Sequence, residues 1–185
     1  MNVTLTWDLF IIVFFAVIIT YSFIIGRREA IKIIIATYIA IVAVQGIGNV
    51  LQRVLAEASD VLLTLGISME ASLLSTFKLV LFIVIIIALA IKAGIAVTYE
   101  KEPGMPLNAA LTGLFGFTTA GLLLSTMLTY TAGVPLLDKN LPAVASLSPI
   151  IQQSQLMQLM ILNQDLWFSL PALALLVAGI VGNRS

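Results

Sequence analysis

Long apolar runs constrain this chain more than any other feature, and the clearest is residues 79–91, which no polar residue interrupts. Lys78 and Lys92 flank this run. A helix rises about 1.5 Å per residue, so the two lysines stand roughly 21 Å apart along it. Because a lysine can lay its aliphatic stem along lipid while its ammonium stays in water, the run predicts a membrane-crossing helix.

The composition supports a membrane class for the whole chain. Of its 185 residues, 61% are apolar and 10% are charged. A soluble fold of this size would leave a largely apolar surface in water, whereas a bilayer supplies an apolar solvent. The net charge is zero, which favours no nucleic-acid partner. Cys and His are both absent, so disulfides, thiolate nucleophiles and imidazole ligands are excluded.

The apolar runs predict an all-α, polytopic transmembrane bundle formed by residues 1–185 as a single membrane domain. The first run follows Asp8 in place of a basic segment, and no small-residue cleavage site precedes Arg27, so we expect a retained span. Four spans are expected at about 7–25, 30–50, 72–97 and 109–130. Residues 166–182 predict a fifth crossing, with an interfacial or re-entrant segment as the alternative.

Two further segments are apolar without forming a full span. Residues 61–69 are too short to cross and favour a re-entrant piece or an interfacial turn. Ser148 and Pro149 have the pattern of a helix start, and glutamines alternate with apolar residues after them. This pattern predicts an amphipathic interfacial helix over about 149–162.

Basic residues predict the orientation, since cytoplasmic loops carry an excess of Lys and Arg. With five spans, one side receives Arg27, Arg28, Lys32, Lys92, Lys101 and Arg184, and the other receives Arg53, Lys78 and Lys139. We therefore expect the N-terminus outside and the C-terminus in the cytoplasm.

The fourth predicted span differs from the others in being rich in small and hydroxyl-bearing residues. Its small residues are Gly113, Gly116, Ala120 and Gly121. Spacings of three and four place the first three on one helix face, where another backbone can approach closely. The pattern favours helix packing in a bundle or an oligomer; a pore lined by hydroxyls is the alternative.

A second cluster, Gly46, Gly48 and Asn49, lies with Gln45 near the end of the second span. Amides are costly against lipid, so we expect these side chains to point inward, for an interhelical hydrogen bond or into a polar cavity.

The residue types of this chain argue against catalysis and against ion-coupled transport. No carboxylate falls at the middle of a span, where an ion-coupled transporter normally needs one. Glu100 and Glu102 flank Lys101 in a loop and form a solvated cluster. We therefore expect no enzyme, no cofactor and no metal site.

The order of these features resembles the colicin V production (CvpA-like) family of bacterial inner-membrane proteins. Asp8 opens the first span, which closes with Gly26, Arg27, Arg28 and Glu29, and Phe115 and Gly116 fit a family pattern in the fourth. Asn108 and Ala109 stand where the family has Asp-Arg, and Thr119 stands where a second Arg is usual. The residues carried over are Asp8, Gly26, Arg28, Glu29, Phe115 and Gly116.

The resemblance implies a role in toxin export or envelope maintenance in the bacterial inner membrane. The leading hypothesis is a non-enzymatic protein that scaffolds an envelope or secretion assembly through oligomerisation. The alternative is an oligomeric pore or small-solute channel or transporter. The expected partners are the lipid bilayer and either further copies or another membrane protein.

Overall fold

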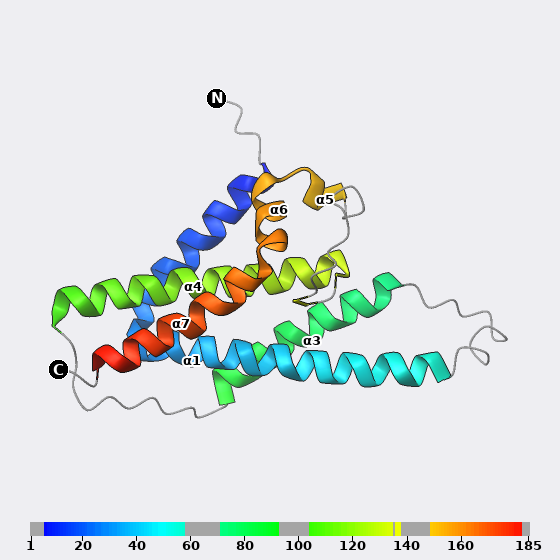
Figure 1. Ribbon diagram of the computed structural model, residues 1–185, viewed down its shortest axis with the longest axis horizontal. Coiled ribbons are helices and arrows are strands. Elements are labelled where there is room, and N and C mark those ends of the chain that lie inside the picture. Colours follow the sequence, from blue (N-terminus) through cyan, green and yellow to red (C-terminus); the bar gives the residue numbers. More distant parts are fainter. Residues whose placement is uncertain (1–5, 58–70, 93–103, 135, 138–148, 183–185) are drawn as a thin grey trace.

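The computed structural model describes residues 6–57, 71–92, 104–134, 136–137 and 149–182, and every regular element in these ranges is a helix. Figure 1 shows them as α1 (Trp7–Glu57), α3 (Ala71–Lys92), α4 (Met105–Ala132), α5 (Pro149–Gln152), α6 (Gln155–Leu162) and α7 (Gln164–Gly182). The predicted all-α class is confirmed.

Three of these helices, α1, α3 and α4, are long and apolar enough to cross a membrane. The pair α6 and α7, which is bent by 69°, is a fourth candidate if it forms one broken span. The helices are compatible with the predicted multi-pass membrane protein. The predicted number of crossings stays a prediction, because α1 contains two of the predicted spans within one kinked helix.

Gly26 divides α1 into a first arm, residues 7–25, and a second arm, residues 27–57. Its φ of 80° and ψ of 169° are non-helical and lie in a region that essentially only glycine occupies. Figure 1 shows that the two arms run in different directions from this point. The kink therefore lies where the sequence predicts the first span to end.

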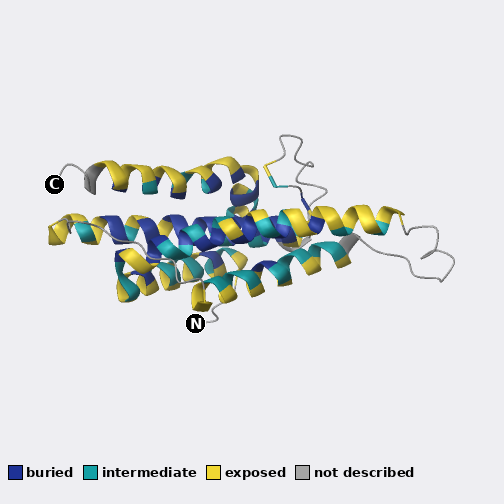
Figure 2. Cartoon of the chain, turned by 90° about the horizontal axis from the view of Figure 1, so that it is seen from below, coloured by how far each residue is buried: buried dark blue, intermediate teal, exposed yellow. Residues whose placement is uncertain are grey.

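Helix α4 is the core of the bundle. In its most apolar window 72% of the residues are buried, against 11% for α1 and 6% for α3. Figure 2 shows the buried residues gathered in the middle of the molecule, while the outer helices present exposed faces. Yet α4 is the least apolar of the three. This arrangement is what a bilayer favours, since lipid solvates the apolar helices and the polar one is covered by protein.

The predicted helix over 149–162 is two helices, which corrects its boundaries. The chain breaks at Ser154, which is extended and whose hydroxyl accepts a hydrogen bond from the Met157 N–H at 3.1 Å. Met157, Met160 and Ile161 of α6 are buried, whereas its exposed residues include Leu159 and Leu162 as well as Gln155. Its predicted place at the membrane surface stays a prediction.

Helix α7 covers the fifth predicted span and continues through Pro171, which is buried. A proline inside a helix weakens the preceding turn. The Tyr38 hydroxyl of α1 donates a hydrogen bond to the Phe168 carbonyl in that turn. A neighbouring helix thus supplies a donor where the proline loosens the backbone ladder.

Several predictions fall on other parts of the chain. Residues 61–69 and 93–97, the glutamates Glu100 and Glu102, and the predicted cap Ser148 lie outside the described residues.

Candidate functional site

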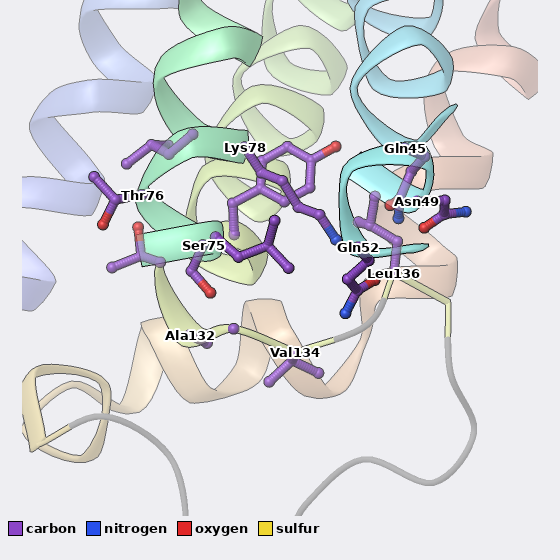
Figure 3. A pocket seen from close by; sticks show the side chains of 14 residues that line it. Gln45, Asn49, Gln52, Ser75, Thr76, Lys78, Ala132, Val134 and Leu136 are labelled. Carbon is purple, nitrogen blue, oxygen red and sulfur yellow. The ribbon is translucent and has the colours of Figure 1, made fainter. Parts of the chain in front are cut away.

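A polar cavity of about 670 Å³ lies at one end of the bundle, among the end of α1, the start of α3 and the end of α4. Figure 3 shows its lining side chains. The polar ones are Gln45, Asn49, Gln52, Ser75, Thr76, Lys78, Tyr130 and Thr131. Apolar side chains such as Leu74, Leu79, Val134 and Leu136 complete the wall. The fold thus brings amides, hydroxyls and one ammonium together in a chain that is otherwise strongly apolar.

The three amides come from one face of α1. Gln45, Asn49 and Gln52 are spaced by four and then three residues, which places them on successive turns of the same side. All three line the cavity, although Asn49 and Gln52 are exposed. Gln45 and Asn49 border this polar space, and the expectation that their amides point inward stays a prediction, since Asn49 is exposed.

Lys78 lies across the cavity instead of simply extending along α3. Figure 3 shows its side chain reaching from α3 toward the α1 segment that carries Gln45, Asn49 and Gln52. Gly48 makes room for it, since a Cβ added there would lie 2.5 Å from Lys78 Cε. The absence of a side chain at Gly48 thus allows the aliphatic stem of Lys78 to lie close to α1. No ion pair of Lys78 occurs within the described part of the chain.

Tyr130 of α4 contributes an unsatisfied hydroxyl. The residue lines the cavity and is 3% exposed, and its ring contacts the Phe82 ring edge-on with centroids 5.6 Å apart. Its hydroxyl has no hydrogen-bond partner among the described residues. Buried hydroxyls almost always have one, so this group marks a place where a further acceptor or donor would be stabilised.

The small residues of α4 pack against the rest of this chain. A Cβ at Gly113 would lie 3.3 Å from the Phe23 ring, and one at Gly116 would lie 2.9 Å from Ser22 Cβ and 3.1 Å from Ile19 Cα. All three neighbours belong to the first arm of α1.

The other two small positions are covered as well. The Trp167 ring of α7 occupies the space that a side chain at Gly121 would need. Ala120 is fully buried. Gly113, Gly116 and Gly121 thus lie against other helices of the same chain.

The threonine hydroxyls of α4 are directed to its own backbone. Four of the buried ones donate to a carbonyl four residues earlier: Thr112 to Asn108 at 2.8 Å, Thr119 to Phe115 at 2.6 Å, Thr126 to Leu122 at 2.7 Å and Thr129 to Ser125 at 2.7 Å. Thr118 donates to the Phe115 carbonyl at 3.2 Å, and Ser125 to the Met160 carbonyl at 3.4 Å. These donors are therefore not available to a solute.

Asp8, from the family-like motif, ties the start of α1 to α6. Its Oδ1 accepts hydrogen bonds from the Ser154 hydroxyl and from the Leu156 N–H, the latter at 3.3 Å. A carboxylate is favourable at a helix N-terminus, where backbone N–H groups lack partners. Asp8 thus reinforces the cap of α6 across a long separation in sequence.

The remaining residues singled out by the sequence lie apart from the cavity. Gly46 is exposed, with nothing within 4 Å of an added Cβ. Arg28 is exposed, and Glu29 forms an ion pair of 2.6 Å with Lys32. Phe115 is completely buried, in a cluster with Ile34 and other residues of α1 and α7. Within the described ranges, no group of three His, Cys, Asp or Glu side chains could hold a metal ion.

A polar cavity was one of two alternatives that the sequence left open for Gln45 and Asn49, and the sequence indicated only part of its lining. Gln52 continues the spacing of Gln45 and Asn49, but it lies beyond the predicted end of the second span. Lys78 and Tyr130 carried no local signal, since their position depends on how α3 and α4 are rotated against α1.

Comparison of the chain with protein-family models, with curated proteins and with solved structures finds no match.

Proposed function

We propose that this protein is a non-enzymatic scaffold of the bacterial inner membrane, similar to the CvpA-like family, that assists an envelope or secretion assembly. The observation that carries the proposal is the burial of α4 by the other helices. Its glycines are covered by α1 and α7, and its threonine hydroxyls are bonded within the helix. A pore wall needs polar groups that face a passage, whereas a scaffold needs a stable body with free outer faces.

The surface that we assign to a partner lies on α3, because α4 is covered. The side chains of Val80, Val84, Ile87 and Ile91 are exposed by 54%, 55%, 52% and 75%. Their spacing of four, three and four residues is that of a helix–helix seam. We propose that a second copy or another membrane protein packs along this line, with the N-terminus outside and the C-terminus in the cytoplasm.

Cysteine crosslinking in native membranes tests this proposal, since the chain has no cysteine of its own. We expect Val84→Cys to be joined by a bismaleimide to a second copy or to a membrane partner. Val44→Cys, at a fully buried position of α1, is the matched control and should give only monomer. Monomer at all four outward positions of α3 would refute the scaffold.

The second candidate function is a small-solute channel, which the polar cavity favours. Flux from proteoliposomes separates it from the scaffold. We expect no leak above that of empty vesicles. Solute efflux that Lys78→Gln or Tyr130→Phe alters would favour the channel instead.

A further inference from the structure

The described lining of the cavity at the end of the bundle is positively charged. Lys78 is the only charged side chain among the described residues that line it, and no carboxylate is among them. An ammonium facing a partly enclosed space, without an ion pair in the described part of the chain, attracts an anion. The expected occupant is therefore negatively charged.

The other polar groups define what kind of anion fits. Gln45, Asn49 and Gln52 each carry an amide that can donate two hydrogen bonds. The Tyr130 hydroxyl, which is buried in the wall of the cavity and has no partner among the described residues, can donate one more. A group with several acceptor oxygens and a negative charge would satisfy all of them, and a phosphate has both properties.

The cavity is large enough, and its wall apolar enough, to hold a molecule larger than an inorganic ion. Its volume of about 670 Å³ falls in the range of about 300–1,000 Å³ that is usual for small-molecule sites. Leu74, Leu79 and Leu136 line it beside the polar groups. An organic phosphate could therefore place its anionic oxygens at Lys78 and its carbon skeleton against the leucines.

We propose that this cavity binds the phosphate group of an organic phosphate, carried either by an anionic lipid headgroup or by a soluble phosphate ester. Lys78 supplies the charge, the α1 amides and the Tyr130 hydroxyl supply hydrogen bonds, and Gly48 leaves space for the lysine stem. This site is independent of the proposed scaffold function, since it uses neither the outer face of α3 nor a second copy.

Native mass spectrometry of the full chain in a neutral detergent tests the site. The two probes are dihexanoyl phosphatidylglycerol and glycerol phosphate. We expect one molecule to bind per chain, and we expect Lys78→Gln to weaken binding about tenfold or more, because a charge-assisted hydrogen bond is lost. Lys78→Arg should restore most of the affinity. Lys92→Gln, which removes the exposed lysine at the other end of α3, should leave it unchanged.

Tyr130→Phe keeps the test decisive if Lys78→Gln does not fold. It removes only a hydroxyl that has no partner in the described chain, so the melting temperature should not fall, whereas the affinity should fall severalfold. Binding of both probes would assign the site to the phosphate group alone, and binding of the lipid only would assign it to a headgroup. If wild type binds neither probe more tightly than Tyr130→Phe and Lys78→Gln do, the proposal is wrong.

Discussion

Replacing Gly116 with leucine is expected to destabilise the bundle more than any other single change considered for this chain. An added Cβ would already lie 2.9 Å from Ser22 and 3.1 Å from the Ile19 backbone. A backbone atom cannot move aside as a side chain can, so α4 and the first arm of α1 must separate. Overpacking of this kind costs roughly 3 kcal/mol. For a chain of this size the melting temperature should fall by roughly 6–12 °C.

The matched control for this change is Gly46→Leu. It places the same side chain on a helix of the same protein, at a position with nothing within 4 Å of an added Cβ. Thermal melting of both variants in one detergent compares them directly. Equal melting temperatures for the two variants would mean that α4 and the first arm of α1 are not in close contact.

Gly26→Ala is expected to have the second largest effect, for a different reason. Nothing lies within 4 Å of an added Cβ, so there is no steric conflict with other residues. The φ of 80° and ψ of 169°, however, are a conformation that alanine rarely adopts. Holding alanine there costs about 1–3 kcal/mol. Alanine also favours the helical conformation, so the variant should shift α1 toward a straighter helix.

Two measurements check this prediction. The melting temperature should fall for Gly26→Ala, whereas Gly46→Ala should leave it unchanged or raise it, because alanine is the better helix former. The distance between spin labels on the two arms of α1, measured by pulsed electron resonance, should broaden or lengthen in Gly26→Ala. A sharp wild-type distance in that variant would show that the kink does not depend on glycine.

The sequence predicted the class of the fold because the class depends on local composition. Apolar runs of sufficient length identify membrane helices without knowledge of their neighbours. The break near Gly26 was also predictable, since a glycine followed by charged residues cannot continue a lipid-facing run unchanged. Gly113 and Gly116 were predicted to allow close packing, and the structure places α1 against both.

The contacts between distant residues could not be predicted in the same way. The hydrogen bond of Asp8 to Ser154 joins positions 146 residues apart, and no local pattern encodes it. Gly121 receives the Trp167 ring only because α7 crosses α4 at that level. For Lys78, the sequence predicted only that the residue lies at one end of a membrane-crossing helix. Its approach to Gly48 depends on the rotation of two helices about their axes, which a run of apolar residues leaves undetermined.

We propose that α4 is a buried core helix and not the wall of a pore. Thr126 tests it most directly, because the residue is fully buried and its hydroxyl donates to the Leu122 carbonyl at 2.7 Å. Thr126→Cys should resist a membrane-impermeant maleimide added to either side of native vesicles, and it should react once detergent unfolds the protein. Asn49→Cys, at an exposed position that borders the cavity, is the positive control and should react in the folded state. Rapid labelling of Thr126→Cys in the folded protein would contradict the claim and establish a water-filled path along α4.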